Sequence, residues 1–378
     1  MPKYAAFTLW IVLIAINSWS QSFGVIRPFA GTISGIPVVA SLKIVDTTLS
    51  GFYYYTKVGE PIYLSGTIRD SKVALSEVVD DSVTGKFSGS ITPDFSELKG
   101  EWKGNGKTFP FAMKYDLPAG SAELGVVNNN FTYVWSRNSI GTEIGATLEG
   151  SFCYIKSLQD AEAMRKMNQI LLETQISPGL SDEQLRNRVV AMLEESFNSL
   201  RQEYDTTVVS FASANDSVLL EESPSMFQWD QQYNWEVLFN ESYLLTIRAL
   251  YYEYTGGAHG NYGYANLVLD MKDGRQLSLE DLFVPGYENQ LKQLALAELK
   301  RQYKASTIED LSDQGFFLEN GFELTDNFFI QKNGIGFTYN PYEIAAYALG
   351  AIDILVPWPS LQTLIRRDGP LAWARSKK

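Results

Sequence analysis

The sequence predicts an α+β protein: an N-terminal all-β domain, folded as a meander or small barrel, followed by an antiparallel sheet with packed helices. Three observations predict this. Short segments of alternating apolar and polar residues fill 22–118, helical patterns follow at 157–200 and 288–304, and hairpin signals recur between 235 and 339. Helices that pack on one side of an antiparallel sheet define the α+β class.

The N-terminal region is predicted to consist of strands because each alternating segment is bounded by turn-forming residues. Gly59 with Pro61, and Gly104 with Asn105 and Gly106, are examples of these turns. Short connections favour antiparallel neighbours, as in a meander or a small barrel. The strands that we expect here are 38–45, 51–57, 62–68, 86–91, 98–103 and 109–115.

A break is predicted at 116–121, where Pro118, Gly120 and Ser121 separate the two patterns. We therefore divide the chain into a signal peptide (1–20), an all-β domain (21–118), a linker (119–123) and an α+β module (124–378). In the module, Ser181 and Gln184 form a capping-box pattern ahead of a helical apolar stripe. The Asp273-Gly274 pair is the strongest hairpin signal.

The first twenty residues predict export. Lys3 precedes the apolar run 7–16, and Ser18-Trp19-Ser20 places small residues where a signal peptidase cuts, with Gln21 as the new N-terminus. Ten residues rise about 15 Å as a helix, about half of a bilayer core of about 30 Å. The only cysteine is Cys153, so no lipoprotein motif follows the apolar run. We expect a periplasmic or secreted protein without a membrane span.

The charge and the rare residue types narrow the function. The net charge of −13 becomes −14 when Lys3 is removed with the signal peptide, which disfavours nucleic acid and favours cationic partners. His259 is the only histidine, so HExxH and three-histidine zinc sites are excluded, and we expect no metal. Phosphate-loop and dinucleotide motifs are lacking, so we expect no cofactor, and there is no GxSxG elbow. A pair of catalytic carboxylates remains possible.

The most informative stretch is 251–262, in which three glycines and four tyrosines surround His259. Glycines let a loop bend sharply, and tyrosines supply rigid contact area for recognition. Two interpretations stay open for His259. It either fastens a tight loop by bonding neighbouring backbone groups or tyrosine hydroxyls, or it takes part in contact with a partner.

Two motifs within about 125–365 resemble the RsiV-like ectodomain family. The first is Thr255-Gly-Gly-Ala-His-Gly-Asn261, followed by Asn266, Asp270, Asp273-Gly274 and 277–283. The second is Phe337, Tyr339 and 340–350, ahead of a strand at 352–356. The best-known member of that family is an anti-sigma factor that senses lysozyme, and the module also precedes the catalytic domain of some peptidoglycan deacetylases. The resemblance implies an envelope-binding module. It carries over neither anti-sigma nor deacetylase activity, because the chain shows neither a sigma-binding segment nor a deacetylase domain.

We therefore interpret the chain as a non-enzymatic envelope protein that binds a protein partner such as lysozyme, or cell-wall glycan. The alternative is a hydrolase or esterase that acts on cell-wall polymers. No residue is assigned a catalytic role. The residues expected to contact a partner are Tyr254, Gly256, Gly257, His259, Asn261, Tyr262, Tyr339, Tyr342, Glu343 and Tyr347.

Overall fold

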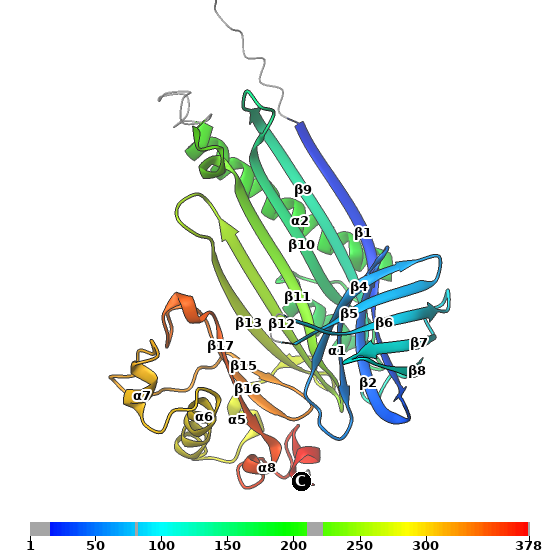
Figure 1. Ribbon diagram of the computed structural model, residues 1–378, viewed down its shortest axis with the longest axis vertical. Helices are drawn as coiled ribbons and strands as arrows, with labels where there is room; N and C mark the ends of the chain where they lie inside the picture. The colour runs from blue at the N-terminus through cyan, green and yellow to red at the C-terminus, as the bar shows by residue number, and fades with distance from the viewer. Residues whose placement is uncertain (1–15, 80–81, 210–221, 377–378) are drawn as a thin grey trace, which may run out of the picture.

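The computed structural model describes residues 16–79, 82–209 and 222–376. One sheet of fourteen strands runs through most of the molecule, in the order β14-β13-β12-β11-β10-β9-β1-β2-β3-β4-β5-β6-β7-β8. A smaller sheet of three strands, β15-β16-β17, packs with short helices at one end (Figure 1). The structure is mixed α+β and mostly β, as the sequence predicts.

The first eight strands form a closed antiparallel barrel, because β1 pairs with β8 as well as with β2. Its interior is filled by apolar side chains such as Phe29, Leu42, Phe87 and Phe111. The small barrel expected for this region is therefore confirmed. The strands are β1 (Ile16–Ile33), β2 (Ile36–Val45), β3 (Thr48–Tyr55), β4 (Ile62–Arg69), β5 (Lys72–Val79), β6 (Ser82–Ile91), β7 (Glu97–Gly104) and β8 (Lys107–Tyr115).

Strand β1 belongs to both halves of the chain. Its residues 16–26 pair with β9 (Glu123–Arg137), and its residues 29–33 pair with β8. Pro28 stands between these two stretches, where the strand changes partner and a backbone N–H is not required. The predicted signal peptide covers residues 1–15, which lie outside the described residues, and residues 16–20, which begin β1. Whether export removes them stays a prediction.

The predicted linker is fastened to the second half of the sheet. The Asn240 side chain accepts from the Ala122 N–H at 2.9 Å and donates to the Ala122 carbonyl at 2.8 Å, and Ser121 Oγ donates to the Asn240 carbonyl at 2.6 Å. The division of the chain into separately folding units therefore stays a prediction, to be weighed against this shared sheet.

The second half of the large sheet consists of β9, β10 (Glu143–Ser157), β11 (Trp229–Glu241), β12 (Leu244–Tyr254), β13 (Asn261–Asp270) and the short β14 (Arg275–Gln276). Neighbours are antiparallel except β10 and β11, which are parallel because α1 (Ala161–Leu171) and α2 (Asp182–Tyr204) connect them. Ser181 forms the expected capping box with Gln184 at the start of α2.

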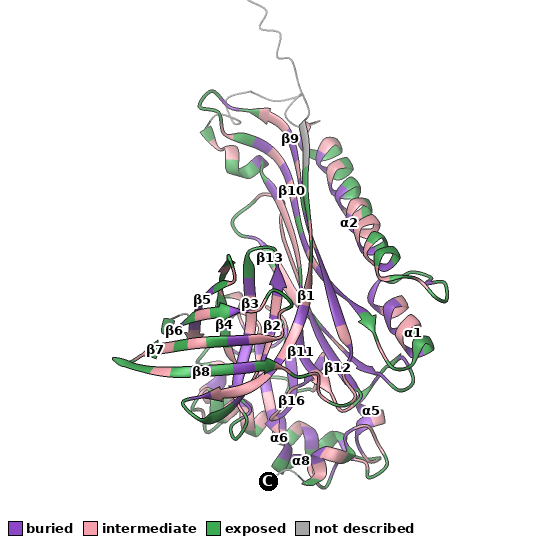
Figure 2. Cartoon of the chain, turned by 90° about the vertical axis from the view of Figure 1, so that its right-hand side faces the viewer, coloured by how far each residue is buried: buried purple, intermediate pink, exposed green. Residues whose placement is uncertain are grey.

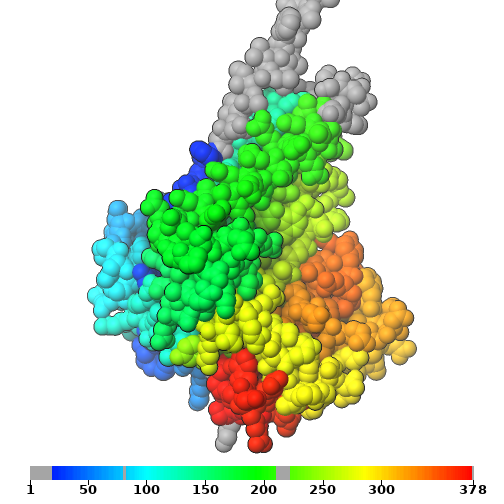
Figure 3. Space-filling model, turned by 180° about the vertical axis from the view of Figure 1, so that it is seen from behind, coloured from blue at the N-terminus to red at the C-terminus, as the bar shows by residue number. Residues whose placement is uncertain are grey.

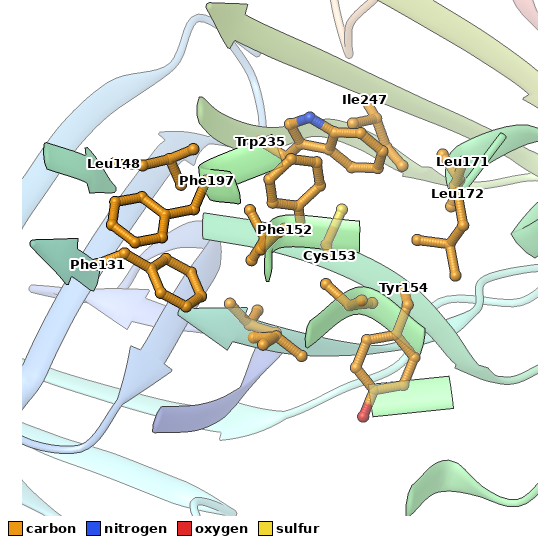
Figure 4. Packing of buried hydrophobic residues seen from close by; sticks show 14 of the residues in the cluster. Phe131, Leu148, Phe152, Cys153, Tyr154, Leu171, Leu172, Phe197, Trp235 and Ile247 are labelled. Atoms are coloured by element: carbon orange, nitrogen blue, oxygen red, sulfur yellow. The ribbon is translucent and has the colours of Figure 1, made fainter. Parts of the chain in front are cut away.

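Helices α1 and α2 cover one face of these strands (Figures 2 and 3). Their apolar residues meet a core that includes Phe131, Phe152, Trp235 and the buried Cys153 (Figure 4). Burial raises the pKa of the Cys153 thiol to about 12, so this cysteine is an inert core residue.

The three-stranded sheet and its helices form a separate apolar core around Phe337, Ile354 and Trp358. The elements are α5 (Leu279–Leu282), α6 (Glu288–Gln302), α7 (Ile308–Ser312), β15 (Phe328–Ile330), β16 (Gly334–Tyr339), β17 (Ile352–Pro357) and α8 (Trp358–Leu361). Short single-turn segments occur at Asp205–Val209, Pro224–Phe227, Tyr347–Leu349 and Ala372–Ser376. Within the described ranges, none of the helices combines the length and apolarity that a membrane crossing requires.

Arg248 on β12 ties this unit to the large sheet. Its guanidinium donates to both carboxylate oxygens of Asp353 on β17, at 2.8 and 3.0 Å. It also donates to Thr338 Oγ1 on β16 at 3.0 Å and to Asn266 Oδ1 on β13 at 3.0 Å. The Arg248 side chain is 10% exposed and Asp353 is 41% exposed, so the guanidinium is largely shielded from water while its acidic partner is not, and together these bonds fix how the two sheets meet.

Candidate binding surface

The loop 255–260 joins β12 to β13 and carries the predicted glycine cluster. Gly256 and Gly257 have φ angles of +94° and +101°, a region that side chains with a Cβ rarely adopt. A Cβ on Gly256 would also lie 2.9 Å from the Met226 carbonyl oxygen, whereas one on Gly257 would meet open space. The loop therefore needs glycine at both positions, and at Gly256 also for close approach to a neighbouring segment.

His259 lies exposed on this loop and is held by a tyrosine from a distant segment. Its ring stacks on Tyr347, with ring centroids 4.3 Å apart and an interplanar angle of 26°. The Tyr347 hydroxyl donates to the Gly260 carbonyl at 2.7 Å, and His259 Nδ1 lies 2.8 Å from the same oxygen. The loop-fastening interpretation of His259 fits these contacts, although the ring is exposed and not buried.

Two further tyrosines extend the cluster. Tyr262 Oη accepts from the Ala351 N–H at 3.1 Å, and its ring meets Tyr347 edge-on with centroids 6.0 Å apart. Tyr342 is 57% exposed, and its ring centroid lies 5.5 Å from that of Tyr347. The structure thus brings together two segments that are about eighty residues apart in the chain. We call His259, Tyr262, Tyr342 and Tyr347 the tyrosine surface.

The remaining predicted residues lie in different surroundings. Tyr254 donates to the Gly257 carbonyl at 3.0 Å and so closes its own loop. Asn261 is exposed at the start of β13. Glu343 is exposed, and its carboxylate accepts from the Asn340 N–H at 2.8 Å. Tyr339 is 3% exposed and donates to the Glu323 carbonyl at 2.7 Å, so its side chain belongs to the core and not to the surface.

Two asparagines that were not among the predicted contact residues, Asn327 and Asn340, cover the edge of β13, which pairs with β14 at residues 269 and 270. Asn340 accepts from the Tyr264 N–H at 2.7 Å, and Asn327 accepts from the Asn266 N–H at 2.8 Å and donates to the Tyr264 carbonyl at 2.8 Å. These side-chain amides form hydrogen bonds with backbone groups of the strand edge, which would otherwise be able to pair with another strand. In the sequence, Asn340 was noted only as part of the second family-like motif, 340–350.

A groove of about 720 Å³ opens between the helices and the outer strands, on the face that α1 and α2 cover. Its floor carries aromatic rings from β10 to β12, and its rim carries charged residues from the helices. The Phe152 ring lies 4.6 Å from Trp235 and 5.8 Å from Tyr233 between centroids, and Tyr233 lies 5.3 Å from Tyr251. These four rings line the floor as one aromatic row.

The polar groups of the groove come from the connection after α1, from α2 and from the segment that follows β16. Glu173, Arg188, Glu195 and Asn340 are among its lining residues. Burial raises the pKa of Tyr251, and its hydrogen bond to the Glu253 carboxylate adds to this shift. Within residues 16–79, 82–209 and 222–376, there is no cluster of three or more histidine, cysteine or acidic residues that could hold a metal ion.

Two segments of the chain match known families. Residues 155–262 match the family described as "Deacetylase PdaC", and residues 280–359 match the family described as "Protein of unknown function (DUF3298)". A search of curated proteins finds no match. The family matches relate the second half of the chain to a group of related families, and the narrower RsiV-like assignment stays a prediction.

A solved structure of a DUF3298 family member resembles the fold of this chain. The crystal structure of a DUF3298 family member from Bacteroides fragilis NCTC 9343 is 24% identical, with a TM-score of 0.56, and the match covers 69% of this chain and 100% of that one. A DUF3298 family protein from Pseudomonas aeruginosa PAO1 is 18% identical, covers 65% of this chain and 94% of that chain, and has a TM-score of 0.41. The first of these supports the fold.

Proposed function

We propose that this protein is exported to the cell envelope and binds cell-wall glycan in the groove between α2 and the outer strands. The observation that carries the proposal is the aromatic row on the floor of a 720 Å³ groove with polar groups along its rim. Pockets of this size with an apolar lining and a few polar groups are the usual form of a ligand site.

The chemistry of the groove suits a carbohydrate chain. Flat aromatic faces such as Tyr233 and Tyr251 can stack against the C–H faces of sugar rings and remove apolar area from water. Carboxylate and amide groups at the rim, such as Glu195 and Asn340, can accept from or donate to sugar hydroxyls. The description of the family that matches residues 155–262 names a deacetylase, which supports an N-acetylated polymer as the class of ligand.

Binding without catalysis is favoured by the placement of His259. The ring is outside the groove lining and is stacked on Tyr347. A general acid or base has to reach the reacting atoms within hydrogen-bond distance, and His259 is not among the residues that line the groove. The hydrolase or esterase alternative would therefore have to use the rim carboxylates Glu173 and Glu195.

A second candidate function is contact with a cationic protein such as lysozyme, and the tyrosine surface favours it. Tyr342 is 57% exposed beside Tyr347 and His259, and tyrosines of this kind are frequent in protein interfaces. The acidic balance of the chain would speed encounter with a cationic partner at low salt.

The glycan proposal is tested by co-sedimentation with insoluble peptidoglycan. Ala191 lines the groove on α2, and Ala191→Trp places a bulky ring in it; Asn198→Trp adds the same ring at an exposed position of α2 outside the lining. We expect the native protein and Asn198→Trp to sediment alike, and Ala191→Trp to bind at least about tenfold more weakly, which is about 1.4 kcal/mol. Equal binding of both variants, or no sedimentation of the native protein, contradicts the proposal.

The protein-partner candidate has its own test by titration calorimetry with lysozyme at low and high salt. Tyr342→Ala should weaken binding, whereas Ile36→Ala, which removes an equally exposed apolar side chain from the barrel, should not. Absence of binding at every salt concentration removes this candidate and leaves the glycan proposal untouched.

A further inference from the structure

A second cavity, of about 220 Å³, lies where the barrel meets the other half of the large sheet. Strands β2, β3 and β4 form one wall and β11 forms the other. Its lining combines three aromatic residues (Phe52, Tyr63 and Trp235) with two charged residues, Lys43 and Glu236. The volume far exceeds the about 10–15 Å³ that one water molecule requires and falls below the about 300 Å³ of the smallest drug-sized pockets. It is the size of a small ligand.

Glu236 is the unusual group in this cavity. Its carboxylate is half-buried and makes no hydrogen bond to any described residue. Arg248 stands opposite it on β12, but the Arg248 guanidinium is already bonded to Asp353, Thr338 and Asn266. Burial raises the pKa of Glu236, and the charges of Arg248 and Lys43 oppose this rise. Because no described side chain or backbone group bonds this half-buried carboxylate, its oxygens can accept hydrogen bonds from a ligand in the cavity.

Lys43 supplies a donor on the same cavity. Its ammonium group donates to Ser151 Oγ at 3.1 Å and to Asn234 Oδ1 at 3.0 Å, which uses two of its three N–H groups. Burial lowers the pKa of Lys43, while the negative charge of Glu236 opposes this shift. Lys43 lies in the barrel and Glu236 in the second half of the sheet, so the pair exists only where the two halves meet.

We propose that this cavity binds one neutral sugar ring, at a site separate from the groove. Adjacent hydroxyls of a sugar both donate and accept, so one can donate to Glu236 while another accepts from the third Lys43 proton. The rings of Phe52 and Tyr63 offer apolar faces for the sugar's C–H groups. A charged ligand fits less well, because each sign of charge would meet one like charge in a partly dry site.

Apart from Trp235, the cavity is lined by different residues from those of the groove, and the inference does not depend on the proposed function. Trp235 lines both cavities, so its fluorescence alone cannot separate them. Calorimetry or ligand-observed NMR on the full chain, with N-acetylglucosamine, glucose and glucuronate as ligands, measures the binding. Variants of each cavity then show at which of the two sites a sugar binds. For a ligand of this size we expect a Kd of the order of 1 mM for the neutral sugars.

Two variants of the cavity test the assignment in independent ways. Ser50→Phe fills the cavity from β3, and Glu236→Ala removes the unpartnered carboxylate; both should weaken binding of a neutral sugar at least about tenfold. Glu149→Ala, at an exposed position of β10, is the matched control and should bind like the native protein. Asn198→Trp, outside the lining of both cavities, should likewise bind a neutral sugar as the native protein does.

Three outcomes would overturn the inference. The first is that neither neutral sugar binds at about 50 mM, which is well above the expected Kd. The second is that both cavity variants bind a neutral sugar as the native protein does. The third is that glucuronate binds more tightly than the neutral sugars. Loss of neutral-sugar binding in Ser50→Phe together with intact peptidoglycan binding would separate this site from the groove. Circular dichroism and unfolding curves of each variant show that the loss comes from the site and not from misfolding.

Discussion

Replacing Arg248 with Met removes the guanidinium that joins the two sheets and retains most of the apolar stem. Four hydrogen bonds are lost: two to Asp353, one to Thr338 and one to Asn266. The guanidinium also lies 4.5 Å from the centroid of the Phe329 ring. The three partners differ in whether water or another protein group can replace the lost hydrogen bond. This difference decides how far the free energy of unfolding falls.

Asp353 is 41% exposed and regains water, so its ion pair with Arg248 contributes only about 1 kcal/mol. Thr338 keeps its bonds to Asp353 and Asn266, at 2.7 and 2.8 Å. Asn266 is 9% exposed and loses the donor to its oxygen, which costs about 1–3 kcal/mol. The contact with Phe329 adds about 0.5–1 kcal/mol. We therefore expect Arg248→Met to lower the free energy of unfolding by about 3 kcal/mol.

Urea unfolding followed by tryptophan fluorescence and circular dichroism measures this change, provided that the slope with denaturant is unchanged. The control is Arg275→Met, because Arg275 also pairs with an acid at 2.8 Å, on Asp281, but is 46% exposed. That variant should change the free energy by less than about 1 kcal/mol. Equal effects of the two substitutions would refute the view that Arg248 joins the sheets.

Three further predictions follow from other parts of the molecule. Glu77→Ala should destabilise the barrel by about 3 kcal/mol or more, because the Glu77 carboxylate accepts hydrogen bonds from three side chains at 2.6–2.8 Å. The control Glu101→Ala removes an exposed ion pair and should lower the free energy of unfolding by less than about 1 kcal/mol in the same assay. Because burial raises the pKa of Glu236 in the folded protein, its contribution is favourable at acid pH and is lost as the pH rises through that pKa. The free energy of unfolding of Glu236→Gln should therefore rise relative to that of the native protein as the pH is raised from acid to neutral. The charged groups that face Glu236 are Arg248, Lys43 and Asp353. A difference between variant and native protein that stays constant with pH would contradict this prediction. Limited proteolysis should cut first within 116–121, and the fragments should stay together in gel filtration because β1 pairs with β9; fragments that separate and stay folded would instead support two independent domains.

Local patterns in the sequence determined much of the secondary structure. The alternating segments 38–45 and 62–68 coincide with β2 and β4, because period-two burial is a local property of a strand. The capping box at Ser181 likewise depends on residues three positions apart. The glycines and tyrosines near His259 indicated a contact region, and the structure places His259 and Tyr347 in one stack.

Other features depended on partners far along the chain. Strand β1 was not predicted, because Gly24, Pro28 and Gly31 are typical of turns; in the folded chain a Cβ on Gly31 would lie 2.0 Å from the Ala112 carbonyl oxygen. The parallel pairing of β10 with β11 requires a long helical connection that no local pattern records.

The two cavities also depend on residues that are far apart in the chain. Lys43 and Glu236 are ordinary surface residue types in the sequence, and only the meeting of the barrel with β11 encloses them together. The groove likewise needs α2 to lie over strands that follow it in the chain. Periodicity tells which side of an element is apolar, but long-range packing decides which sides meet, and a binding site forms where that packing leaves a gap.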